Sequence, residues 1–92
     1  MATIERSTSA AKRTHDHDTI REWVESRGGT PSIVESTWDG HSGLLRVDFD
    51  EQEEALAEIS WEEFFRIFDE NELDFLYHDE SESRFNEFVG RE

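Results

Sequence analysis

The sequence predicts an α+β domain built as a two-layer sandwich, with helices packed on one face of a three-stranded sheet. Two segments carry apolar residues at helical spacing, and three shorter segments alternate apolar with polar residues. Turn residues separate these segments, so we expect the order α-β-β-α-β-α. Ninety-two residues are too few for a second independent core. We therefore expect residues 14–92 to form a single domain and residues 1–13 to form a disordered tail.

The first helix is predicted to begin after Asp16, whose carboxylate can accept hydrogen bonds from the free N–H groups of the first turn. It should end at Gly28, which can adopt the left-handed conformation of a helix end. Pro31 prevents the helix from continuing. One apolar stripe follows from the spacing of Ile20, Trp23 and Val24.

The second helix has the strongest local signal in the chain, the segment "ISWEEFFRIF". Ser60 and Glu63 have the spacing of a capping box, in which each side chain accepts from a backbone N–H at the other residue. Asn71 is expected to supply the left-handed exit. The buried stripe should comprise Trp61, Phe64, Phe65 and Phe68.

Three strands are predicted over residues 31–38, 44–49 and 73–78, with "DGHSG" joining the first two as a hairpin. Residues 50–58 should be an acidic loop, and residues 83–89 a short last helix. The third strand could lie parallel beside the second or antiparallel beside the first. Antiparallel pairs are commoner, which favours the strand order 3-1-2.

The charge balance is extreme, with 24 acidic residues, 9 basic residues and a net charge of −15. Arginine occurs eight times and lysine only once, at Lys12. Many carboxylates with almost no lysine are typical of a protein that stays soluble in concentrated salt, where screening weakens their repulsion. A basic protein partner and mimicry of DNA are the alternatives. Direct binding of nucleic acid is not expected, because phosphate neutralisation needs positive charge.

The chain has no cysteine, which excludes disulfides, thiolate metal sites and cysteine nucleophiles. No apolar run approaches the roughly 20 residues of a membrane span, and the first residues lack the apolar centre of a signal peptide. We therefore expect a soluble cytoplasmic protein without membrane contact, and a monomer is favoured.

The segment "HDHD", residues 15–18, could be a metal site or the polar start of a helix. If residues 17 and 18 are helical, side chains two positions apart point to nearly opposite faces and cannot share one ion. Only an extended His15–His17 pair could converge, and it would need help from His78 and Asp79. The spacing favours the helix start, and no cofactor or metal is expected.

Four segments, in order "DHDTIREWVESRGGTPSIV", "LLRVDF", "EISWEEFFRIFDENELDFLY" and "SRFNEFV", resemble a family of small, acidic, uncharacterised prokaryotic proteins. The resemblance runs from about residue 14 to residue 91. Members often carry the label 1,4-alpha-glucan branching enzyme, a class built on a catalytic barrel of about 250 residues. Because this chain is far shorter, the resemblance implies a fold and its boundaries but no activity.

No catalytic residues can be assigned, because carboxylate pairs arise by chance among 24 acidic side chains and no nucleophile motif occurs. Trp38, at the end of the hairpin, is a weak candidate for partner binding, since tryptophan is enriched in binding hot spots. We expect a small non-catalytic interaction domain with an unknown protein partner. The alternative is an enzyme accessory or a binder of carbohydrate or metal. A concave pocket with buried carboxylates would favour that alternative, and an apolar surface patch the interaction domain.

Salt should raise the melting temperature substantially. Residues 1–13 hold one acidic and three basic residues, which leaves −17 on residues 14–92. The Debye length falls from about 30 Å at 0.01 M salt to about 3 Å at 1 M, so molar KCl removes most of the self-repulsion. Thermal unfolding followed by circular dichroism measures the effect. Glutamine at Glu53, Glu54 and Glu62 should reduce it, and a melting temperature independent of salt would contradict the halophilic interpretation.

Overall fold

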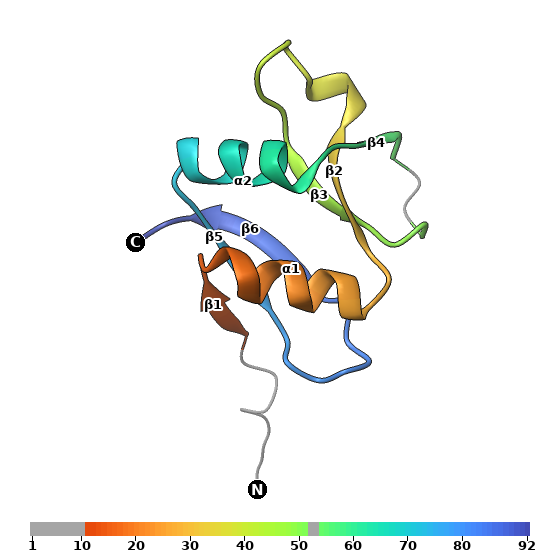
Figure 1. Cartoon of the computed structure of the whole chain (residues 1–92), viewed down its shortest axis with the longest axis vertical. Coiled ribbons are helices and arrows are strands. Elements are labelled where there is room, and N and C mark those ends of the chain that lie inside the picture. Colours follow the sequence, from red (N-terminus) through yellow and green to blue (C-terminus); the bar gives the residue numbers. More distant parts are fainter. Residues whose placement is uncertain (1–10, 52–53) are drawn as a thin grey trace, which may run out of the picture.

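The computed structural model describes residues 11–51 and 54–92, and the fold is mixed α+β, as predicted (Figure 1). Both long helices and all three predicted strands are present, but the first strand, predicted over residues 31–38, ends at Val34, after which a 3-10 turn begins. The elements in chain order are β1 (Lys12–Thr14), α1 (His17–Ser26), β2 (Thr30–Val34), the 3-10 turn η2 (Glu35–Thr37), β3 (Leu45–Asp48), β4 (Leu56–Glu58), α2 (Trp61–Glu70), β5 (Leu73–Tyr77) and β6 (Asn86–Gly90).

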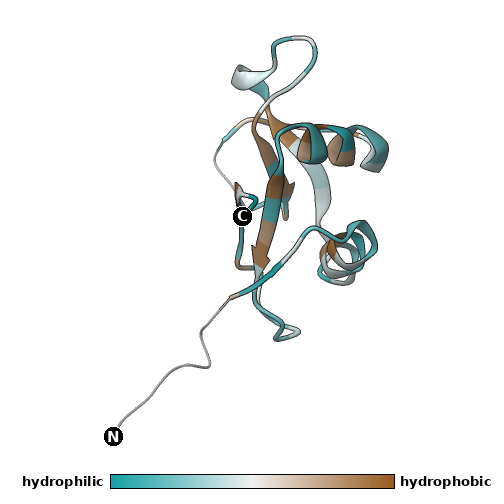
Figure 2. Ribbon diagram, turned by 90° about the vertical axis from the view of Figure 1, so that its left-hand side faces the viewer, coloured by the Kyte–Doolittle hydropathy of each residue, from teal (hydrophilic) through white to brown (hydrophobic). Residues whose placement is uncertain are grey.

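The strands of residues 11–51 and 54–92 form two antiparallel sheets of three strands each, with the orders β1-β5-β6 and β3-β2-β4. Figure 2 shows both helices on the same side of the strands. No helix in the described part of the chain is long and apolar enough to cross a membrane.

The predicted single sheet with order 3-1-2 is wrong. The third predicted strand, β5, belongs to the other sheet, and β4 occupies the place beside β2 that was assigned to it. β4 lies inside the predicted acidic loop, where Leu56, Ala57 and Glu58 pair with Val34, Ile33 and Ser32. Three residues are too few to show an alternation in the sequence, so the pairing with β2 determines this strand.

The predicted helix over residues 83–89 is also wrong, because Asn86–Gly90 forms the strand β6. Phe88 lies opposite Phe75 of β5 and packs against the core, so the strand buries the same apolar side chain that the predicted helix was expected to bury. The apolar residues of so short a segment fit the spacing of a helix as well as that of a strand, and the pairing with β5 determines which of the two forms.

The chain becomes regular before the predicted domain boundary. Lys12 and Arg13, assigned to the disordered tail, pair with Tyr77 and Leu76 in β1. Residues 1–10 of the predicted tail lie outside the described residues. The ordered domain therefore includes two of the basic residues assigned to the tail.

The predicted helix starts are confirmed, but the Glu63 carboxylate bonds Arg66 rather than completing the predicted capping box at Ser60. The Asp16 carboxylate accepts from the Thr19 N–H at 2.9 Å, and the Ser60 hydroxyl accepts from the Glu63 N–H at 3.0 Å. Gly28 takes the left-handed conformation after α1, with φ of 76°. After α2 the left-handed residue is Glu72, with φ of 52°, rather than the predicted Asn71.

The core lies between the helices and the two sheets. A Cβ atom on Gly29 would come within 2.7 Å of Val47 and 2.8 Å of Phe49, so the chain after α1 packs directly on β3 and the loop that follows it. Trp61 and Phe65 of the predicted stripe are only partly buried. The buried cluster comprises Ile20, Trp23, Val24, Ile33, Leu45, Val47, Phe64, Ile67, Phe68 and Phe75.

Ser60→Ala should lower the melting temperature by about 4–8 °C. Loss of an N-cap acceptor costs about 1 kcal/mol, and that cost corresponds to this shift in a domain of this size. Ser81→Ala, in the exposed loop between β5 and β6, is the matched control and should leave the melting temperature unchanged. Equal melting temperatures for the two variants would mean that the Ser60 cap contributes nothing.

Candidate functional site

A groove of about 860 Å³ lies between β3 and β6, which are outer strands of the two sheets. Ile67 and Asn71 of α2 line it, and the hairpin loop after η2 closes one end. We call this hollow the groove. Its lining residues are Thr37, Asp39, Ser42, Gly43, Leu44, Leu45, Arg46, Ile67, Asn71, Leu73, Asn86, Glu87 and Phe88.

The hairpin loop, residues 39–43, is held against α2 by polar contacts. The His41 ring bonds Glu70 at 3.0 Å, and Arg66 donates to the His41 carbonyl oxygen at 2.5 Å. Within the loop, the Asp39 carboxylate accepts from the N–H groups of Ser42 at 2.8 Å and His41 at 2.9 Å. These hydrogen bonds, that of Ser42 first, lower the pKa of Asp39 and keep it ionised. The end wall of the groove is therefore anchored and negatively charged.

The rim of the groove carries exposed apolar side chains. Leu44 lines the groove and is 54% exposed. Trp38, which the sequence singled out, is 40% exposed and lies against Gly43, with its ring Cε3 atom 3.5 Å from a Cβ placed there. Trp38 thus borders the groove without lining it. Leu44 is a side chain that the sequence analysis did not single out, because the alternation of apolar and polar residues does not show how exposed each side chain is.

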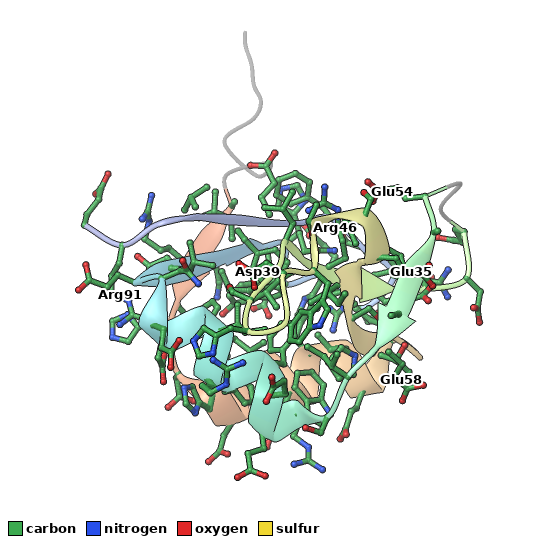
Figure 3. The ribbon with its side chains drawn as sticks, turned by 90° about the horizontal axis from the view of Figure 1, so that it is seen from above. Glu35, Asp39, Arg46, Glu54, Glu58 and Arg91 are labelled. Carbon is green, nitrogen blue, oxygen red and sulfur yellow. The ribbon has the colours of Figure 1, made fainter. Side chains whose placement is uncertain are left out.

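Positive charge in the groove is already paired. Arg46 is the basic residue of the lining, and Glu54 bonds its Nε atom at 2.9 Å (Figure 3). Its Nη1 atom donates to the Leu45 carbonyl oxygen at 3.0 Å. The other carboxylates of the lining are Asp39 and the exposed Glu87. Among the described residues neither forms an ion pair with arginine or lysine, although the charge of His41 acts on Asp39. The groove is consequently a negative site with an apolar rim.

A second hollow, of about 860 Å³, surrounds a buried carboxylate on β5. The Asp74 side chain is 5% exposed, and its two oxygens bond Arg13 and His15, each at 3.0 Å. Arg91 lies 3.6 Å from the oxygen that His15 contacts. Burial acts to raise the pKa of Asp74, but the hydrogen bonds and charges of Arg13 and His15 outweigh it and lower the pKa.

The second histidine of "HDHD" has a different aspartate. The His17 ring bonds Asp69 at 2.9 Å and stacks on Phe65, with ring centres 4.0 Å apart, so it ties α1 to α2. Arg91 contacts both aspartates, 3.3 Å from Asp69 and 3.6 Å from Asp74. We call these six side chains the histidine–aspartate network: Arg13, His15, His17, Asp69, Asp74 and Arg91.

The four residues of the alternative metal set do not come together as a group. His15 bonds Asp74, whereas His78 stacks on Phe85 and Asp79 pairs with Lys12 at 3.0 Å. In residues 11–51 and 54–92, no group of three or more histidine, aspartate or glutamate side chains is arranged to hold a metal ion. His15 contacts the buried carboxylate of Asp74, and His17 contacts the carboxylate of Asp69 on α2.

Comparisons of the chain with protein-family models, curated proteins and solved structures give no match. The resemblance to a family of small acidic proteins stays a prediction. The groove and the histidine–aspartate network are therefore interpreted from their geometry alone.

Asp74→Asn should lower the free energy of unfolding at pH 7 by about 1.5–3 kcal/mol, the range for hydrogen bonds to charged groups. The pKa of Asp74 is lowered in the folded state, so its stabilising effect is present above its unfolded pKa of about 3.9. That effect is lost as the pH falls through the folded value. Urea unfolding across this pH range should show the two proteins converging in acid.

Asp79→Asn is the matched control, because it removes an aspartate whose ion pair with Lys12 is exposed. It should change the free energy of unfolding little at any pH. A loss as large as that of Asp74→Asn would show that net charge, rather than the buried contacts, sets the effect.

Proposed function

We propose that this protein is a small, non-catalytic interaction domain that binds a protein partner at the groove. The observation that carries the proposal is the exposed apolar rim, Leu44 and Trp38, beside a hollow that two sheets and α2 shape together. Protein interfaces combine an apolar or aromatic centre with a polar rim. The groove has this composition, with Leu44 and Phe88 beside the polar groups of Asp39, Asn71 and Glu87.

A protein partner accounts for the groove better than a small ligand does. Sites for small ligands enclose most of the ligand surface. The groove is instead open, and its most exposed apolar residue, Leu44, is 54% accessible to solvent. A partner surface that covers this side chain would remove its apolar area from water, which favours binding.

The hollow around Asp74 supports the alternative function, a binder of a small ligand such as a carbohydrate or metal, because it contains a buried carboxylate. Both oxygens of Asp74 are, however, engaged by Arg13 and His15. A ligand would have to displace one of these contacts. The structural role of Asp74 thus makes the groove the better candidate.

The acidic surface fits a cytoplasmic protein of a halophile, and it also suits a basic partner. Much of the positive charge is paired within the chain. Three of the ion pairs are Arg21 with Glu25, Arg66 with Glu63, and Arg84 with Glu51. The charge left for a partner to meet is therefore negative. Steering by such a surface speeds the approach of a basic partner at low salt.

Leu44→Asp should abolish capture of the partner. The tagged protein is used as bait in an extract of the cells that make it, at their own salt, and captured proteins are quantified by mass spectrometry. Loss of the apolar rim should lower recovery of the partner at least about tenfold, the change expected for 1.4 kcal/mol. The melting temperature of the bait establishes that it is folded.

Phe85→Asp is the matched control. Phe85 is also an exposed apolar residue, and the same new charge is introduced, but it does not line the groove. This variant should retain the partner. Equal recovery with both variants would place the interaction elsewhere on the molecule.

A further inference from the structure

We infer that the partner supplies an extended segment that adds to β6 as a new strand and carries lysine or arginine at alternate positions. This inference rests on the proposed function and specifies how the groove is used. Strand addition is a general mode of peptide recognition, in which the main chain gives affinity and alternate side chains give specificity.

The backbone of β6 faces the groove at alternate residues. Beyond the end of the pairing with β5, the Arg91 N–H donates to the Glu72 carbonyl oxygen, so these opposed residues form a hydrogen-bonded pair. Such pairs alternate along an antiparallel ladder. Glu87 therefore bonds toward β5, whereas the N–H and C=O groups of Asn86 and Phe88 point away from it. Both of these residues line the groove.

On the opposite side of the groove, β3 also has backbone groups that point away from its own sheet. The Val34 N–H donates to the Leu44 carbonyl oxygen, so Leu44 bonds toward β2 and the next residue, Leu45, points its backbone groups to the other side. Leu45 lines the groove, and its carbonyl oxygen accepts from Arg46. A strand placed beside β6 would thus approach β3 and extend one sheet toward the other.

β6 is the longest outer strand of the two sheets among the described residues, since β3 has four residues and two charges. Natural proteins protect outer strands by making them short and by placing charges on them. β1 and β4 follow this rule, because each has three residues and β1 carries Lys12 and Arg13. β6 has five residues, Asn86–Gly90, and one charge. Five residues match an added segment about 17 Å long.

The faces of β6 determine the chemistry of the added segment. Phe88 packs against Phe64 and Phe68 of α2, so the side chain of Glu87 points to the opposite face. Residues of the new strand that face α2 would lie over Ile67 and should be apolar. Those on the other face would lie beside Glu87, where cross-strand pairs of opposite charge are favourable. Asp39, held ionised at the end of the groove, adds to this preference.

The probes are three seven-residue peptides with blocked ends, in which valine alternates with lysine, serine or glutamate. Titrated into the isotopically labelled full chain, the lysine peptide should bind at least about tenfold more tightly than the serine peptide. It should also slow the amide hydrogen exchange of Asn86 and Phe88, because these N–H groups become hydrogen-bonded. The glutamate peptide should not bind. Binding of the serine peptide as tight as that of the lysine peptide would overturn the basic preference.

Asn86→Pro removes one N–H group that faces the groove and should weaken lysine-peptide binding at least about tenfold. Glu58→Pro is the matched control, on the outer strand of the other sheet. The Ile59 N–H donates to the Pro31 carbonyl oxygen, so the Glu58 N–H points away from β2 by the same alternation. This control should bind normally. Equal binding by both proline variants would overturn strand addition.

Charge variants test the same inference without altering the backbone. Glu87→Gln with Asp39→Asn should weaken the lysine peptide, whereas Glu22→Gln with Glu62→Gln removes the same charge from the exposed faces of the helices and should not. Equal weakening by both pairs would overturn the local preference. Failure of the lysine peptide to bind at millimolar concentration, while Leu44→Asp still abolishes partner capture, would overturn this inference and leave the proposed function standing.

Discussion

The apolar stripe of α2 is the contact on which the arrangement of the sheets depends. Phe64, Ile67 and Phe68 are fully buried, and α2 contacts strands of both sheets. The rings of Phe64 and Phe68 reach Phe88 of β6, whereas Ile67 lies in the same buried cluster as Leu45 of β3. The two sheets have no strand in common, and this helix packs against an outer strand of each, β3 and β6.

The groove is a consequence of that arrangement. If β3 and β6 were hydrogen-bonded to one another, the six strands would form one sheet and no hollow would remain beneath α2. The hairpin loop forms part of the wall of this hollow, and contacts from Arg66 and Glu70 hold His41 against the helix. A binding site at this place therefore needs no residues beyond those that maintain the fold, apart from the exposed rim at Leu44 and Trp38.

The sequence predicted correctly the features that depend only on residues close to one another in the chain, such as the helix caps. The caps at Asp16 and Ser60 require only a side chain and the backbone of the next turn, so their spacing was enough. The strand β6 and the burial of Asp74 depend on residues far away in sequence. Asp74 alternates with apolar residues on β5, a pattern that normally places a carboxylate in water. Its contacts with Arg13 and His15, 61 and 59 residues earlier in the chain, reverse that expectation.

The two histidines of "HDHD" illustrate the same distinction. The predicted helix start left only an extended His15–His17 pair able to share an ion, whereas in the structure each histidine contacts a different aspartate. Which aspartates they contact depends on β1 lying beside β5 and on α1 lying beside the end of α2. The basic and histidine side chains near the start of the domain thus serve to pair carboxylates from the rest of the fold. Asp39 and Glu87 at the groove form no ion pair with arginine or lysine of the described residues, which is why we propose a partner with its own positive charge at that place.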